Sequence, residues 1–279
     1  MRGKIDFYTL PSTRYAGITE NDACTWVENV DCIKKHDKLY VPYAIYDERD
    51  QDGITVDEFY QNSRKNDKGM HDAVEYIMRT LWELGRSDAS YDLLKSQESN
   101  GFLAFRQDVV EDIIVDRCVQ GSPKKLLSDL LAVRRVFALK SESYEEYVQW
   151  FQDIFPSLLF HENACDTIEK LGDYKNVISE LHRHLCALND YGRSTYLECE
   201  MDEAAALSAL KAKCNVTCSG KGSKEIKDYK LEYNGIKITC NPHTKLNNSH
   251  SDQRIYFCWG RDEVADHKII IARIGRHWE

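Results

Sequence analysis

The sequence predicts an α+β protein with a mostly helical N-terminal part that includes a few strands, followed by a small C-terminal antiparallel sheet packed on helices. Two patterns in the sequence support this prediction. Apolar residues recur at helical spacing over most of the chain between residues 56 and 213. Beyond residue 228, alternating apolar and polar runs are separated by turn signals, which is typical of strands and hairpins.

The distribution of charge divides the chain of 279 residues, whose net charge is −9. Residues 211–279 carry nine lysines and four arginines against eight acidic residues, a net charge of +5, whereas residues 1–210 carry −14. A basic region on an acidic body favours a polyanion as partner. We therefore expect two domains: residues 1–170 as a mixed, mostly helical regulatory or partner-binding domain, and residues 171–279 as a basic α+β module.

The N-terminal elements are predicted from local pattern. The alternating run 4–10 predicts a strand, and residues 39–46 predict a second one, which Pro42 would place at a sheet edge. Apolar residues recur at helical spacing from about residue 56 to residue 84. Gly85 then lies where a helix C-cap is expected.

The middle of the chain is predicted to be helical throughout residues 100–160. One apolar face is formed by Val109, Val110, Ile113, Ile114 and Cys118. A second helix starts at Pro123, and Ser143 is a candidate N-cap of a third. Further helices are expected over about 174–188 and 201–213.

The C-terminal region is predicted to be a sheet of at least four strands. Residues 229–233 and 236–240 flank Asn234-Gly235, a strong hairpin signal. The last hairpin pairs residues 254–259 with residues 268–278. On the first of these strands Arg254, Tyr256 and Cys258 share one face, because side chains alternate along a strand.

Composition bears on where the protein acts. No apolar run approaches the roughly 20 residues that cross a bilayer, and the N-terminus lacks the apolar segment of a signal peptide. We therefore expect a cytoplasmic protein without membrane contact. In a reducing compartment the ten cysteines are most simply buried thiols.

The basic and aromatic residues of the C-terminal region form the strongest candidate site. Metal-free RNA cleavage needs a base for the 2′-hydroxyl, an acid for the leaving oxygen and cations for the phosphate. Because histidine titrates near neutrality and arginine binds phosphate bidentately, His277 and His243 are expected to share the acid and base roles. Tyr256 would stack a base or orient the hydroxyl. The phosphate would be held by Arg254, Arg273 and Arg276, with neither metal nor cofactor. A solvated basic surface around a small sheet is the alternative.

Lysines in the same region are candidate backbone contacts to nucleic acid. They are Lys221, Lys224, Lys245 and Lys268.

A zinc site is a second interpretation of part of the C-terminal region. Cys214, Cys218, Cys240 and His243 could supply a tetrahedral set of three thiolates and one imidazole. His243 would then be structural. However, Cys214 and Cys218 also alternate as the buried face of a strand would.

The last hairpin resembles the C-terminal sheet of the RelE/ParE superfamily of bacterial toxins. The resemblance rests on the arginine-led run 254–257, the isoleucine-rich run 269–271 and the sequence Ile274-Gly275-Arg276-His277, preceded by two predicted helices. It covers about the last 100 residues and implies an mRNA endoribonuclease that uses basic residues without metal, or a gyrase-poisoning relative. The order Arg276-His277 departs from the Gly-His-Arg-like end of the family.

The predicted function is thus a metal-independent endoribonuclease of the toxin or phage-defence type, acting on RNA. Residues 1–170 would control access or bind an antitoxin or other protein partner. The alternative is a non-catalytic subunit of a defence or toxin–antitoxin complex that binds nucleic acid or protein through the basic sheet.

Overall fold

The structure is a computed structural model. It describes residues 5–12, 14–35, 37–65, 68–89, 92, 102–105, 113–115, 123–220, 229–247, 252–261, 264 and 267–277. The chain divides into two compact units, Met1–Phe137 and Ala138–Glu279.

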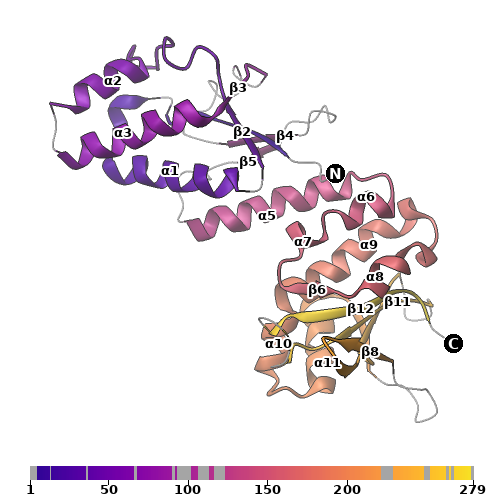
Figure 1. Cartoon of the computed structure of the whole chain (residues 1–279). Helices are drawn as coiled ribbons and strands as arrows, with labels where there is room; N and C mark the ends of the chain where they lie inside the picture. The colour runs from indigo at the N-terminus through magenta and orange to yellow at the C-terminus, as the bar shows by residue number, and fades with distance from the viewer. Residues whose placement is uncertain are drawn as a thin grey trace. The chain divides into compact units, whose positions relative to one another are not determined.

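The first unit is a mixed sheet with helices (Figure 1). Its elements are β1 (Asp6–Thr9), η1 (Tyr15–Gly17), α1 (Glu20–Lys34), β2 (Lys38–Val41), α2 (Val56–Ser63), α3 (Lys68–Glu83), β3 (Gly85–Arg86), β4 (Phe102–Phe105) and β5 (Ile113–Val115), with α5 (Pro123–Leu139) crossing into the second unit. The strand order is β3-β2-β1-β4-β5. β1, β2 and β3 run parallel, whereas β4 is antiparallel to both β1 and β5.

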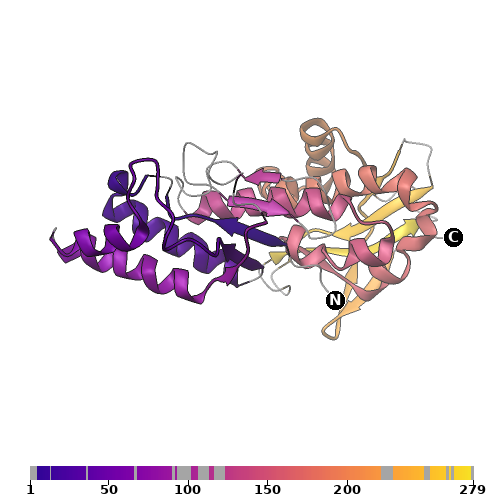
Figure 2. The same cartoon turned by 90° about the horizontal axis from the view of Figure 1, so that it is seen from above.

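Helices α1 and α3 lie side by side (Figures 1 and 2). α1 begins at a capping box in which the Thr19 side chain accepts from the backbone of Asp22, whose carboxylate accepts in return. Trp26 of α1 is buried, and its indole nitrogen donates to the Thr9 hydroxyl at 3.1 Å. This hydrogen bond satisfies the polar atom of a large core side chain and fixes α1 against β1.

The second unit carries most of the predicted site. Its elements are α6 (Tyr144–Val148), α7 (Phe151–Ile154), β6 (Leu158–Phe160), α8 (Glu162–Asp166), η2 (Ile168–Leu171), α9 (Tyr174–Ala187), the π-helical turn η3 (Leu188–Gly192), α10 (Arg193–Glu198), α11 (Glu203–Cys214), β7 (Thr217–Ser219), β8 (Lys230–Tyr233), β9 (Ile236–Thr239), β10 (His243–Lys245), β11 (Gln253–Cys258) and β12 (Ile269–Arg276). The main sheet has the order β6-β12-β11-β10-β7. β6 is parallel to β12, and the other neighbours are antiparallel.

Helical segments cover one face of this sheet. Gly192 of η3 lies directly against Ile269 and Trp259. Trp259 in turn stacks on Tyr196 of α10, with 4.8 Å between ring centroids. Ile255, Phe257 and Ile274 are fully buried on the same face, so the helices and the sheet share a continuous apolar core.

A separate two-stranded ribbon, β8–β9, covers part of the opposite face. Its turn is Asn234-Gly235, and both residues have positive φ, 50° and 79°. Asparagine and glycine adopt this conformation readily, which explains the tight hairpin. Leu231 and Ile238 of the ribbon are buried in one cluster with Tyr256 and Cys258 of β11.

The α+β class is confirmed, and so are the strands near residues 6 and 39, the helices α9 and α11, and the two C-terminal hairpins. Several details differ. Phe102–Phe105 (β4), Ile113–Val115 (β5) and Leu158–Phe160 (β6) are strands within residues 100–160, which were predicted to be helical throughout. β2 lies between β1 and β3 rather than at the sheet edge predicted from Pro42. Gly85 belongs to β3 rather than capping a helix.

The predicted four-stranded tail is also corrected. β8 and β9 pair only with each other among the described strands, while β11 and β12 pair with β10 and β6. The predicted domain boundary after residue 170 falls inside the second unit. The physical reason is that β6 is hydrogen-bonded to β12, which places residues 158–160 in the C-terminal sheet.

One finding concerns membranes. Within the described segments, no helix combines the length and the apolar character that crossing a bilayer requires.

The turn after β11 yields a stability prediction. A Cβ on Gly260 would lie 1.7 Å from the backbone carbonyl oxygen of His267, so Gly260→Ala forces the backbone to move. We expect a loss of about 1–3 kcal/mol in the free energy of unfolding, measured by urea unfolding. Gly220→Ala is the matched control because its Cβ meets only side chains at 3.5 Å. Equal stability of the two variants would contradict the packing described.

Candidate functional site

The register of three strands gathers the predicted residues on one face of the main sheet. His243 of β10 lies opposite Tyr256 of β11, which lies opposite Arg273 of β12. Lys245 lies opposite Arg254 in the same way. Because directly opposed residues of antiparallel strands point to the same side, these five side chains share one face. We call His243, Lys245, Arg254, Tyr256 and Arg273 the cation face.

Tyr256 is the centre of the cation face. Its side chain is only 3% exposed. The ring centroids of His243, Tyr229 and His277 lie 5.1, 5.7 and 6.4 Å from its own. Since these neighbours and the β8–β9 ribbon cover the ring, Tyr256 offers no surface on which a base could stack. The Tyr256 ring instead positions the three aromatic side chains that pack around it.

His243 is held in its neutral form, with the lone pair on Nε2. Its Nδ1 lies 3.0 Å from the carbonyl oxygen of Asn241. A carbonyl can only accept, so Nδ1 carries the hydrogen and Nε2 carries the lone pair. Burial lowers the pKa of His243 to about 4, and the charges of Arg254, Lys245 and His277 act in the same direction. The imidazole is therefore neutral at pH 7 and able to take up a proton at Nε2.

The three arginines differ in burial and in the contacts that each guanidinium already makes. Arg254 is 7% exposed, and burial lowers its pKa. Arg276 is exposed, donates from Nε to the carbonyl of Lys170 at 3.3 Å and lies 3.8 Å from a carboxylate oxygen of Asp252. The buried Nε of Arg254 and that of Arg273 both lack an acceptor among the described residues, so this atom does not separate the two. Arg254 donates from a terminal nitrogen to the carbonyl of Gln253 at 3.0 Å, whereas Arg273 is half-buried and its guanidinium makes no ion pair with a described carboxylate. Arg273 is therefore the arginine best placed to hold an added anion.

The other predicted residues lie in different places. His277 is exposed directly after β12, and its backbone nitrogen donates to the carbonyl of Asp252 at 2.5 Å. Lys268 directly precedes β12, at the end of the strand far from Arg276. The structure therefore does not bring Lys268 to the cation face, contrary to the prediction from the sequence. Lys221 and Lys224 lie outside the described residues.

Two residues beside the cation face, Tyr229 and Asn163, were not predicted from the sequence to belong to a site. Tyr229, at the start of the ribbon, stacks on Tyr256 with an interplanar angle of 26°. Its hydroxyl is hydrogen-bonded to the side chain of Asn163 from α8, and Arg273 is close enough to affect its pKa. The sequence separation between Asn163 and Tyr229 hides this association, because only the folded sheet brings α8 and the ribbon together.

The zinc set does not assemble. Thr244 is opposite Cys218 while His243 is opposite Ser219, so Cys218 and His243 point to opposite faces of the sheet. Cys240 is buried, and a hydrogen bond with Cys258 together with burial raises its pKa. Among the described residues, no group of three or more His, Cys, Asp or Glu side chains is arranged to hold a metal ion.

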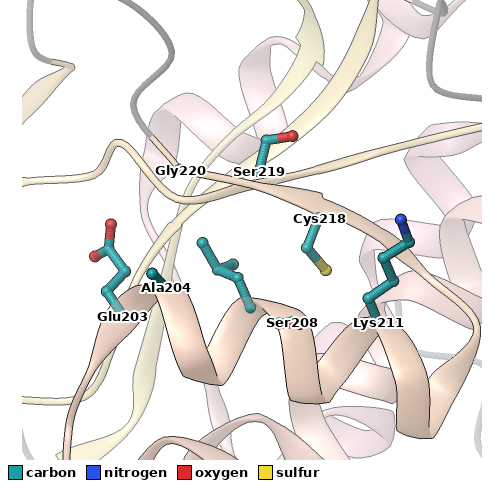
Figure 3. Close-up of a pocket in the computed structure, with 8 residues that line it drawn as sticks. Glu203, Ala204, Ser208, Lys211, Cys218, Ser219 and Gly220 are labelled. Carbon is teal, nitrogen blue, oxygen red and sulfur yellow. The ribbon is translucent and has the colours of Figure 1, made fainter.

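A hollow of about 580 Å³ lies between α11 and β7, beside Cys218 (Figure 3). Glu203, Ser208 and Lys211 line it from the helix. Burial raises the pKa of Cys218 to about 12, so the thiol stays protonated and is a poor nucleophile. Because Cys218 points away from His243, this hollow is not part of the cation face.

Comparison with known proteins adds no constraint. Protein-family models, curated proteins and solved structures were searched, and none matches this chain.

The low pKa of His243 predicts a pH dependence of stability. Its folded pKa lies below the ordinary value of 6.5, so the unfolded chain binds more protons between about pH 4 and pH 6.5. The free energy of unfolding should therefore fall as the pH drops through this window. Urea unfolding of the protein and of His243→Gln at pH 7 and pH 5 checks this.

Between pH 7 and pH 5 we expect the protein to lose about 1–2 kcal/mol more than the variant does. NMR of the imidazole should show His243 neutral at pH 6. A titration midpoint near that of a solvent-exposed histidine would refute the burial argument.

Proposed function

We propose that the chain is a metal-independent endoribonuclease of the toxin or phage-defence type, with the cation face and His277 as its active site. The observation that carries this proposal is the placement of a neutral imidazole, an exposed imidazole and a half-buried arginine around one buried tyrosine. His243, His277 and Arg273 are these three groups. The net charge of +5 over residues 211–279 supports a polyanionic substrate.

The proposed reaction is an intramolecular transfer at phosphorus. His243 Nε2 takes the proton of a ribose 2′-hydroxyl, and the resulting oxygen attacks the adjacent phosphorus. The bond from phosphorus to the 5′-oxygen breaks, and protonated His277 donates the proton that this oxygen requires. Arg273 stabilises the charge of the pentacovalent phosphate. The products are a 2′,3′-cyclic phosphate and a 5′-hydroxyl.

The resemblance to the RelE/ParE superfamily supports the same proposal. The arginine-led and isoleucine-rich runs of the resemblance are the paired strands β11 and β12. Within the proposal, Arg254 and Arg276 play lesser roles in holding phosphate than Arg273, because Arg254 is buried and Arg276 lies beside Asp252. The first unit would bind an antitoxin or other protein partner.

Cleavage of single-stranded RNA in buffer with excess EDTA tests the proposal. We expect activity in the unsubstituted protein and a loss of about 10²–10⁴-fold in His243→Gln, because the general base is removed. Arg273→Gln should lose about 10²–10³-fold. Lys268→Ala is the control, since Lys268 lies at the opposite end of β12.

Product ends add a second readout. The fragments should carry a 2′,3′-cyclic phosphate. RNA with a 2′-deoxy substitution at the cleavage position should not be cleaved, because it lacks the attacking hydroxyl. A requirement for a divalent metal, or unchanged cleavage by His243→Gln, would refute the assignment.

One observation favours a second function, a non-catalytic nucleic-acid-binding subunit. Tyr256 and Arg254 are buried, so part of the predicted site is a packed surface rather than an open one. In that case binding of RNA should weaken steeply as salt rises, without any turnover. Filter binding across salt concentrations, run beside the cleavage assay, separates the two functions.

A further inference from the structure

The ring of Tyr229 is held from several sides, although it lies outside any regular strand. Its backbone nitrogen donates to the side-chain oxygen of Asn241 at 3.1 Å, and its carbonyl accepts from the backbone nitrogen of Cys240 at 2.8 Å. The ring stacks on Tyr256. Its hydroxyl therefore has a defined position beside the cation face.

Asn163, the partner of that hydroxyl, is fixed as well. It belongs to α8, which follows β6 and runs beside β12. The backbone nitrogen of His161 donates to the carbonyl of Ile271 at 3.0 Å, and the Thr167 hydroxyl donates to the carbonyl of Ile274 at 2.6 Å. These two bonds clamp both ends of α8 to β12, on either side of the position of Arg273.

Three side chains with hydrogen-bond donors belong to α8, β12 and the ribbon at this place: Asn163 is hydrogen-bonded to the Tyr229 hydroxyl, and Arg273 is near enough to Tyr229 for its charge to lower the pKa of that hydroxyl. Arg273 presents guanidinium N–H groups, and its buried Nε has no acceptor among the described residues. Tyr229 supplies an O–H and Asn163 an amide. No ion pair joins Arg273 to a described carboxylate. Burial raises the pKa of Tyr229, so its hydroxyl stays protonated at neutral pH. A half-buried arginine among neutral donors is a site for an anion with several oxygens.

We propose that Arg273, Tyr229 and Asn163 form a phosphate-binding site, with Arg273 paired to the anion and the Tyr229 hydroxyl and the Asn163 amide donating to its other oxygens. The identification of that anion as a phosphodiester of RNA rests on the proposed function. The site then holds a phosphate on the β12 side of Tyr256, across that ring from His243 on β10. Tyr229 and Asn163 are binding residues that accompany the general base.

The test uses binding rather than cleavage. The probe is a short single-stranded DNA oligonucleotide, which lacks the 2′-hydroxyl and so cannot be cleaved by this route. Tyr229→Phe keeps the ring and removes the hydroxyl, and Asn163→Asp puts a negative charge of almost the same shape into the site. Tyr233→Phe is the matched control, because Tyr233 lies in the same ribbon and packs against the same cluster.

We expect Tyr229→Phe to weaken binding about tenfold and Asn163→Asp about 100-fold, with Tyr233→Phe within about twofold of the unsubstituted protein. All three variants should still unfold in one cooperative thermal transition, with any shift limited to the loss of about one hydrogen bond. Inorganic phosphate should compete with the oligonucleotide, and competition that is lost in Tyr229→Phe identifies a site for phosphate itself. Equal binding by Tyr229→Phe, Asn163→Asp and the unsubstituted protein would overturn the site.

The two proposals fail in different ways. If the variants lose binding but the protein cleaves no RNA, the phosphate site stands and the ribonuclease falls. If the protein cleaves RNA while Tyr229→Phe and Asn163→Asp bind and cleave normally, the ribonuclease stands and the phosphate site falls.

Discussion

The antiparallel pairing of β10, β11 and β12 around Tyr256 determines the positions of all the side chains to which the proposed function assigns a role on this sheet. It brings His243 and Arg273 to the two sides of one buried ring. A slip of one residue would turn every side chain of a strand to the opposite face, where helices pack. The bulge between Tyr256 and Phe257 shifts the register of β12, so Arg273 and Ile270 both join the face covered by the ribbon.

Burial around Tyr256 links this pairing to reactivity. The β8–β9 ribbon excludes water from one side of the ring, and the same low-polarity surroundings keep His243 neutral. Neighbouring positive charges add to this effect and also attract a polyanion. In the proposed reaction the neutral imidazole of His243 takes a proton on one side of Tyr256, while Arg273 holds the phosphate on the other side. The packing, the electrostatics and the proposed chemistry therefore all depend on the contact between Tyr256 and the β8–β9 ribbon.

Local pattern was enough to predict β11, β12 and the ribbon, because alternation and the Asn234-Gly235 turn act over short distances. The alternation also placed Arg254 and Tyr256 on one face correctly. Short β6 and β7 carry no comparable signal, and the apolar run at Ile113–Val115 fits a helix as well as a strand. The cysteine and histidine spacing indicated zinc, but only the register shows that Cys218 and His243 face opposite ways. The Asn163–Tyr229 association depends on tertiary structure alone.

The most direct test of the cation face locates the ligand. In an NMR titration with the uncleavable oligonucleotide, the side-chain signals of His243, His277 and Arg273 should shift together and saturate at one concentration. The signals of Lys211 and Cys218, on the other face of the sheet, should stay in place. If the oligonucleotide instead shifts the signals of residues in the α11–β7 hollow or in the first unit, and the signals of His243 and Arg273 do not change, the site lies elsewhere.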